Sequence, residues 1–284
     1  MQQVPEPGSG HGESVPYTVA AMARKRSRLD LLLAERGYFS SRTAAARAVR
    51  AGQVKLGPDG PLALRPSQDV RPDQEIEILE GKRYVSRGGI KLANALDALD
   101  LDVDGLQCLD VGASTGGFTD CLLQRGAAHV TALDVAYGQI DDTIRHNDAV
   151  TVIERLNARG LVPTDLEGQP DLVVIDVSFI SLRKVLEPVA AVCGAGARIM
   201  AMVKPQFELG RKRVGRGGVV RIPEDRREAV VGIADFALEL GLSLLGVAPT
   251  GLPGPKGNLE TFLLLGTEGE SAVSGAVLCE SVEL

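Results

Sequence analysis

The pattern of apolar and polar residues predicts strands alternating with helices through the rear two thirds of the chain. From Gly105 onward, the apolar runs are QCLDVG, HVTALDV, VTVIE, PDLVVIDVSF and ARIMAMVK. Segments with helical spacing lie between or after them, namely GGFTDCLLQRG, SLRKVLEPVAAVC and REAVVGIADFALELG. This alternation predicts an open α/β sheet with buried strands. The last two runs, LSLLGVAP and LETFLLLG, are joined by a loop too short for a crossover helix, so we expect an antiparallel edge pair.

The front of the chain, at residues 25–82, has the pattern of a separate small α+β module. Two short helices are predicted: SRLDLLLAERG, between Ser27 and Gly37, and SSRTAAARAVRAG, which Ser41 can cap and Gly52 can end. Two short strands, QVKL and QEIEIL, follow these helices. The second helix offers arginines on one side, at Arg42, Arg47 and Arg50.

Charge is distributed unevenly between the two parts. The whole chain carries a net charge of −6. Residues 23–91 contain 15 basic and 8 acidic residues, a net charge of +7, and the first 22 residues carry −2, so residues 92–284 carry −11. A basic front and an acidic rear suggest that the front contacts a polyanion. A solvated charged surface without a partner is the alternative that the charges alone leave open.

Cysteine spacing and the length of apolar runs restrict the class of protein. The four cysteines lack CxxC spacing and the chain has three histidines, so we expect no metal site, and free buried thiols in a reducing cytosol. No run of about 18 apolar residues is present. The N-terminus also lacks the pattern of a signal peptide. We therefore expect a cytoplasmic protein without stable membrane association.

A glycine-rich turn follows the first strand of the rear part, in LDVGASTGGFTDCLL. The candidate cofactor-binding residues of this segment are Asp110, Gly112, Ala113, Ser114, Gly116 and Gly117. Asp134 ends the next strand, 22 residues after Gly112, where an acid commonly binds ribose hydroxyls. Ser114 stands where G-x-G-x-x-G has the glycine that lets a dinucleotide pyrophosphate approach the backbone. The pattern therefore favours S-adenosylmethionine over a nicotinamide dinucleotide. A turn without a ligand is the remaining alternative.

Charged residues mark three further strand ends. Asp176 ends LVVID, Lys204 ends IMAMVK, and Glu260 opens the final strand, LETFLLL. Any one of these can be simply the point where a strand meets solvent. All three at the carboxyl rim of one sheet indicate a site, because ligands of open α/β sheets bind there. Lys91, in SRGGIKLANAL before the first strand, can reach the same rim.

These motifs together resemble a known family. SRxxxKL, the glycine-rich turn and the charged strand ends resemble the FtsJ-like ribose 2′-O-methyltransferases, whose Lys-Asp-Lys-Glu tetrad corresponds to Lys91, Asp176, Lys204 and Glu260. The front module resembles the α-L RNA-binding motif of a ribosomal protein, through RLD at residues 28–30, Gly37, SR at 41–42, Ala45 and GQV at 52–54. The two modules in this order resemble the TlyA family, also called haemolysin A, over residues 25–267.

The resemblance implies an activity, a cofactor and roles for particular residues. The expected reaction is S-adenosylmethionine-dependent methylation of a cytidine 2′-hydroxyl in ribosomal RNA, in the large subunit, with the small subunit left open. Lys204 is expected to act as the general base, which a lysine does only when its surroundings favour the neutral amine. Gly112, Ala113 and Ser114 would hold the methionine part and Asp134 the ribose. Three further positions carry expected roles: Tyr137 and Asn157 beside the adenine, and Phe179 stacked on a flipped cytosine or, alternatively, packed in the core.

RNA contacts are expected from both parts of the chain. The residues predicted to bind RNA are Arg28, Arg42, Arg47, Arg50 and Lys55 in the front module and Arg211, Lys212 and Arg213 in the basic loop LGRKRVGRGG.

We expect a tail at 1–23, an RNA-binding domain at 24–82, a linker at 83–88, a methyltransferase domain at 89–268 and a flexible tail at 269–284. The rival interpretations are a membrane-active haemolysin, a non-catalytic RNA-binding or ribosome-assembly factor, and a nicotinamide-dependent oxidoreductase.

Overall fold

The computed structural model describes residues 26–79 except Ala51, residues 83–269 except Arg211 and Arg216, and residues 271, 277 and 280. The predictions for the tail at 1–23, for Arg211, for Cys279 and for most of 269–284 lie outside the described residues. So does the prediction for the side chain of Arg50, although its backbone ends a helix.

The front module is built from two helices and two short antiparallel pairs of strands. Its elements are β1 (Ser27–Arg28), α1 (Leu29–Glu35), α2 (Arg42–Arg50), β2 (Val54–Lys55), β3 (Asp69–Val70) and β4 (Glu77–Ile78). β1 pairs with β3, and β2 pairs with β4. Apolar side chains from both helices and from β2 form its core, including Leu29, Leu33 and Val54, which are fully buried. The predicted α+β module is confirmed in the structure.

The two helix starts of this module differ. Ser41 precedes α2, and its Oγ accepts a hydrogen bond from the backbone N–H of Ala44 at 3.1 Å, as predicted. The helix predicted between Ser27 and Gly37 is present as α1, but Ser27 does not mark its start, because Ser27 is paired in β1 and Arg28 occupies the N-cap position without a side-chain cap. The backbone N–H groups of Leu29 and Asp30 donate instead to the carbonyl oxygens of Gln68 and Pro66, at 2.9 and 2.8 Å, so the first turn does not need a side-chain cap.

The rear part is one seven-stranded sheet, with the order β10-β11-β9-β8-β5-β6-β7. Its strands are β5 (Gln107–Val111), β6 (His129–Asp134), β7 (Val150–Glu154), β8 (Leu172–Ile175), β9 (Arg198–Val203), β10 (Ser243–Pro249) and β11 (Thr261–Gly266). The five strands from β5 to β9 are mutually parallel. The predicted antiparallel pair is present, but only β10 lies at the edge, because β11 also pairs antiparallel with β9.

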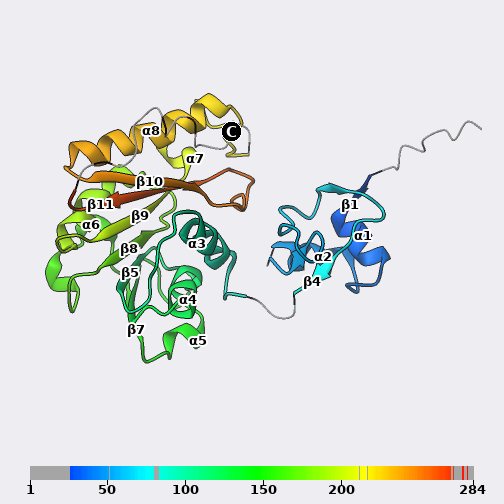
Figure 1. The fold of residues 1–284 in the computed structure, drawn as a ribbon, viewed down its shortest axis with the longest axis horizontal. Helices are drawn as coiled ribbons and strands as arrows, with labels where there is room; N and C mark the ends of the chain where they lie inside the picture. The colour runs from blue at the N-terminus through cyan, green and yellow to red at the C-terminus, as the bar shows by residue number, and fades with distance from the viewer. Residues whose placement is uncertain are drawn as a thin grey trace, which may run out of the picture.

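Helices cover both faces of this sheet (Figure 1). They are α3 (Arg87–Ala98), α4 (Gly117–Gln124), α5 (Asp142–Arg145), α6 (Leu186–Val192), α7 (Pro205–Glu208) and α8 (Pro223–Glu239), with short 3-10 turns at Ala158–Gly160, Pro163–Asp165 and Leu182–Lys184. Alternate strand residues point to opposite faces. Val173 and Ile175 pack with α6 and α8, whereas Leu172 and Val174 pack with α3 and α4. The predicted α/β fold with a Rossmann-like sheet is confirmed.

Candidate active site

Strand direction brings the four tetrad residues to one rim of the sheet. Asp176 follows β8 and Lys204 follows β9, and these strands are parallel neighbours. β11 runs antiparallel to β9 with Thr261 opposite Val203, so Glu260, just before Thr261, lies beside Lys204 in the register. The start of an antiparallel strand thus meets the ends of the parallel ones.

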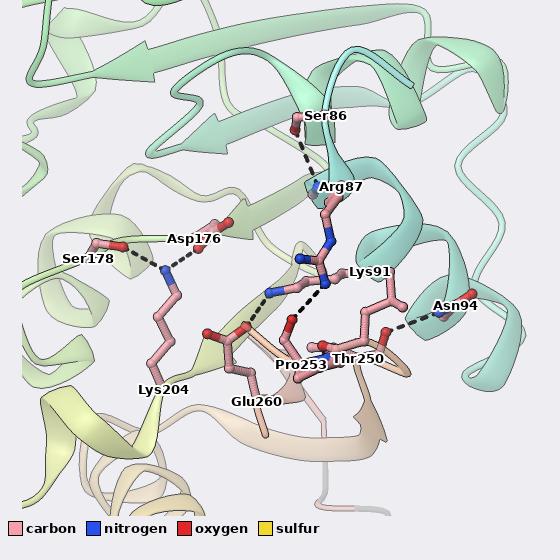
Figure 2. Close-up of polar contacts among 12 residues, drawn as sticks. Ser86, Arg87, Lys91, Asn94, Asp176, Ser178, Lys204, Thr250, Pro253 and Glu260 are labelled. Carbon is pink, nitrogen blue, oxygen red and sulfur yellow. Dashed lines mark hydrogen bonds and ion pairs between the residues drawn. The ribbon is translucent and has the colours of Figure 1, made fainter. Parts of the chain in front are cut away.

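Lys204 is buried at this rim and has two polar partners (Figure 2). Its Nζ forms an ion pair with Asp176 and donates a hydrogen bond to Ser178 Oγ at 2.8 Å. The lysine is 7 % exposed, whereas the Asp176 carboxylate stays partly accessible. A buried ammonium needs such partners to offset the loss of hydration.

Lys91 forms the second ion pair of the site, with Glu260. Both residues are buried, at 6 % and 4 % exposed. Lys91 comes from α3, and two hydrogen bonds attach this helix to the loop between β10 and β11: Arg87 donates to the carbonyl oxygen of Pro253 at 2.9 Å, and Asn94 donates to that of Thr250 at 3.0 Å. The helix and the loop therefore hold the two charges of this pair in place.

The glycine-rich turn lies against the end of β8. Gly112 has a φ of +89°, and a Cβ there would lie 2.7 Å from the carbonyl oxygen of Asp176. A side chain is excluded by both conformation and space. Ser114 and Ala136 donate backbone hydrogen bonds to the two oxygens of the Asp134 carboxylate, at 2.7 and 2.8 Å. Asp134 thus fixes the turn, with further acceptor capacity for hydroxyl groups.

Asp110 lies directly behind the turn and is 1 % exposed. Its Oδ2 accepts hydrogen bonds from the backbone N–H and the hydroxyl of Thr119, at 3.0 and 2.7 Å. Its Oδ1 has no hydrogen-bond partner among the described residues. Burial raises the pKa of Asp110 to about 7, and the neighbouring charges of Asp176 and Asp134 act in the same direction.

Two cavities open beside the turn. The larger, of about 1090 Å³, is lined by Gly112, Ser114, Asp134 and Asn157, and the smaller, of about 460 Å³, by all four tetrad residues together with Gly112–Thr115. A nucleoside fits the larger cavity, where Asp134 and apolar residues such as Leu133 and Leu156 lie. The smaller one leads to the lysines. This donor set fits S-adenosylmethionine, which carries a nucleoside and an amino acid but no phosphate.

Of the residues predicted to flank the adenine and the target base, Asn157 and Phe179 line the larger cavity and Tyr137 does not. Asn157 lines it and caps the following 3-10 turn. Tyr137 is 68 % exposed outside the lining, with the guanidinium of Arg155 4.3 Å from its ring centroid. Phe179 is 90 % exposed, with a φ of +65°, and its ring lies 5.4 Å from that of Phe207. The core alternative for Phe179 is therefore wrong.

The remaining predicted residues lie as follows. Ala113, Gly116 and Gly117 are buried in the turn and at the start of α4. Arg28 and Arg42 both contact the buried carboxylate of Asp30. Lys55 pairs with Glu77, and Arg213 pairs with Asp225 and Glu228, whereas Arg47 and Lys212 are exposed. The structure does not bring the module and the 212–213 loop into one described cavity.

Several residues of the site were missed from the sequence. Ser178 binds Lys204, and Gln206 and Phe207 line the cavities around it. The segments DVSF and VKPQF, which directly follow two strand ends, contain all three and were the available signal. Cys108 and Cys121 are buried and Cys193 is half-buried, and all three are free. No group of residues with metal-ligand geometry is found in the described part of the chain.

The fold and the site define an α/β methyltransferase joined to a small basic module. Comparison with known families agrees, because residues 84–267 match the FtsJ-like methyltransferase family and residues 27–76 match the S4 domain. The chain therefore belongs to the FtsJ-like methyltransferases, in the TlyA family of that class, and uses S-adenosylmethionine.

Three relatives illustrate the extent of the similarity. A Mycobacterium tuberculosis protein named 16S/23S rRNA (cytidine-2′-O)-methyltransferase TlyA is 46% identical over 92% of this chain and 97% of its own length. Hemolysin A of Brachyspira hyodysenteriae is 33% identical, over 82% of this chain and 97% of its own. A solved structure from Streptococcus thermophilus, which also bears the name hemolysin, is 37% identical, has a TM-score of 0.70, and covers 92% of this chain and 95% of that one.

Proposed function

We propose that this chain methylates the 2′-hydroxyl of a cytidine in ribosomal RNA. The observation that carries the proposal is the pair of buried ion pairs, Lys204–Asp176 and Lys91–Glu260, beside the glycine-rich turn. The M. tuberculosis relative named for this reaction supports the substrate, as does the S4 domain. A nicotinamide-dependent oxidoreductase is disfavoured, because the family is one of methyltransferases.

The tetrad residues and Ser178 have different roles in the proposed reaction. When bound, S-adenosylmethionine supplies a methyl group on a positively charged sulfur. Lys204 Nζ first releases its extra proton to solvent, and the neutral amine then takes the proton of the 2′-hydroxyl, while Asp176 and Ser178 hold that nitrogen in position. General-base assistance of this kind contributes roughly 10²–10⁴-fold. Lys91 and Glu260 close the other side of the site and restrict where the ribose can lie, and positioning can contribute about 7–11 kcal/mol at most.

The cofactor is held by the turn and by the ends of β5 and β6. Gly112, Ala113 and Ser114 face the methionine part through their backbone, and Asp134 receives the ribose hydroxyls. Gly116, Gly117 and Asp110 support the turn from behind. Tyr137 and Asn157 flank the adenine, and Phe179 stacks on the target base after it leaves its helix.

The front domain, at 24–82, anchors the RNA. Its binding residues are Arg28, Arg42, Arg47, Arg50 and Lys55, and the loop of the methyltransferase domain adds Arg211, Lys212 and Arg213. A linker at 83–88 joins it to the methyltransferase domain at 89–268. Phosphate contacts of this kind position the substrate and make binding dependent on salt. The partners are ribosomal subunits, in the cytoplasm, and no metal is used.

Mass spectrometry of ribosomal RNA tests this function. RNA from cells with the gene deleted is expected to lack a 2′-O-methylcytidine that the intact gene restores, and purified protein with S-adenosylmethionine is expected to add it. Lys204→Ala should lower the transfer rate by at least about a hundredfold, since the base is lost. Titration calorimetry should show that this variant still binds S-adenosylmethionine.

Two outcomes would count against parts of the proposal. Identical RNA fragments with and without the gene would remove ribosomal RNA as the substrate. Full activity in Lys204→Ala would remove Lys204 as the base. An RNA-binding assembly factor would change ribosome profiles without adding methyl groups.

Relatives that carry the name hemolysin give a second candidate function, a membrane-active protein. No helix in the described ranges is long and apolar enough to cross a bilayer. Release of a dye trapped in lipid vesicles tests this candidate directly. We expect no release at micromolar protein, and leakage that survives Lys204→Ala would establish a separate activity.

A further inference from the structure

A third cavity, of about 350 Å³, adjoins Lys204 and Glu260 and has no residue of the glycine-rich turn in its lining. Phe179 and Phe207 supply apolar walls, and Lys204 and Glu260 line its inner end. Its volume suits one flat base, and its aromatic walls offer stacking surfaces. Resting on the proposed function, this is the place for the base whose ribose faces Lys204.

Gln206 lies at the junction of this cavity and the larger one. It is the second residue of α7, and Lys204 stands two positions before it. Its Oε1 is inaccessible to solvent and has no hydrogen-bond partner among the described residues. A buried acceptor without a partner is unfavourable, and a ligand in the cavity supplies the missing donor once the amide turns toward it.

Other polar side chains of the same cavity are already engaged. Ser178 Oγ accepts from Lys204, and Glu260 pairs with Lys91. The Asn258 amide accepts from the backbone N–H of Val220 at 2.9 Å and donates to the carbonyl oxygen of Gly218 at 2.8 Å. Lys256 is exposed and suits a phosphate rather than a base edge. Within this lining, Gln206 has the side-chain acceptor that is buried without a partner among the described residues.

We propose that Gln206 reads the edge of the target base and selects cytidine over uridine. The exocyclic amine of cytosine donates a hydrogen bond, whereas uracil presents a carbonyl oxygen at the same position. When the amide turns toward the cavity, Oε1 accepts from the cytosine amine, whereas with uracil it would meet a second acceptor, the uracil oxygen. The amide must turn over to accommodate uracil.

Two substitutions separate this role from a structural one. Gln206→Leu keeps the volume and removes both polar atoms, so the preference for cytidine over uridine should fall by roughly ten- to a hundredfold. Gln206→Glu keeps inward acceptors that cannot be inverted, so it should preserve or sharpen the preference. Gln169→Leu, at the opposite end of the strands, is the matched control and should change nothing.

The measurement is kcat/KM for two ribosomal RNA transcripts that differ only at the methylated nucleotide, which is a cytidine in one and a uridine in the other. Calorimetry of S-adenosylmethionine binding shows whether each variant keeps its cofactor site. An unchanged cytidine-to-uridine ratio in Gln206→Leu would overturn the proposal for Gln206 while the wild-type activity stands. Absence of methylation by the wild-type protein would instead refute the proposed function itself.

Discussion

At the scale of single residues, Asp110 links the cofactor turn to the stability of the fold. Its carboxyl group is enclosed behind the turn, and burial raises its pKa to about 7. In an unfolded chain the same group has a pKa near 4. The native state therefore binds the proton more tightly than the unfolded state, and the contribution of this residue to stability is lost as the pH rises from about 4 through about 7.

Asp110→Asn is expected to remove this pH dependence. Between pH 5.5 and 8, the free energy of unfolding of the wild type should fall by about 2 kcal/mol through Asp110, because each pH unit below the native pKa is equivalent to about 1.4 kcal/mol. The asparagine retains an acceptor for Thr119. Urea unfolding at both pH values measures the difference.

The choice of pH range isolates this residue from Asp30. The Arg28 guanidinium lowers the pKa of Asp30, so its contribution to stability is complete above pH 5 and is lost only in acid. An equal decline with pH in wild type and Asp110→Asn would show that Asp110 is ionised in the native protein.

At the scale of elements, α3 carries Lys91 to the rim and depends on a close contact with α4. A Cβ at Gly89 would lie 2.7 Å from the carbonyl oxygen of Gly117 and 2.4 Å from the Tyr84 ring. The backbone of Gly117 cannot move aside as a flexible side chain can, so the starts of α3 and α4 can approach this closely only with glycine at position 89. The close contact between α3 and α4 therefore sets the position of Lys91 relative to Glu260.

Gly89→Ala should therefore displace α3 and weaken the Lys91–Glu260 pair. We expect a loss of about 1–3 kcal/mol in the free energy of unfolding, typical of overpacking, and a larger fall in methyl transfer than in S-adenosylmethionine affinity. Gly168→Ala has open space around its Cβ and serves as the control. Thermal unfolding measures the loss of stability, and the rate of methyl transfer is measured in parallel. Wild-type activity in Gly89→Ala would show that α3 tolerates the shift.

At the scale of the whole molecule, the proposed RNA contacts come from both parts of the chain, whereas the proposed chemistry lies in the rear part alone. The front module holds its arginines in two ways: Arg28 and Arg42 contact Asp30, whereas Arg47 is exposed on α2. Ordered arginines lose less side-chain freedom when they bind phosphate. The rear part carries a net charge of −11, so we expect the long-range electrostatic attraction of RNA to come mainly from the basic front module.

Arg47→Glu is expected to weaken RNA binding without changing the cofactor site, and Arg42→Glu together with Arg47→Glu should weaken it further. The salt dependence of the affinity should become shallower, since fewer phosphate contacts release counterions. Fluorescence anisotropy with a ribosomal RNA fragment at several salt concentrations measures both. Arg198→Glu, at an exposed residue that begins β9 at the end opposite Lys204, is the matched control, and equal losses in both variants would indicate only a change of net charge.

Much of the architecture follows from local patterns. The apolar runs predicted the strands of the large sheet, and the DVGASTGG segment predicted the cofactor turn, because these signals depend on neighbouring residues in the chain. Helix α3 was not predicted, because the two glycines after Arg87 disfavour a helix in its first turn. Its N-cap residue, Ser86, is the local signal for its start. The exposure of Phe179 could not be predicted either, because an aromatic after an apolar strand reads equally well as core.

By itself, the sequence determined the α/β class, the basic front module, the family and the four charged residues of the tetrad. Only the tertiary structure decided which charges pair, because Lys91 and Glu260 are 169 positions apart and meet through the antiparallel insertion of β11 next to β9. It also decided that Gln206 has a buried acceptor without a partner in the described part of the chain. Residue types and local patterns can be recognised directly in the sequence. Pairing across the sheet depends on strand order and register, which are determined by segments far apart in the chain.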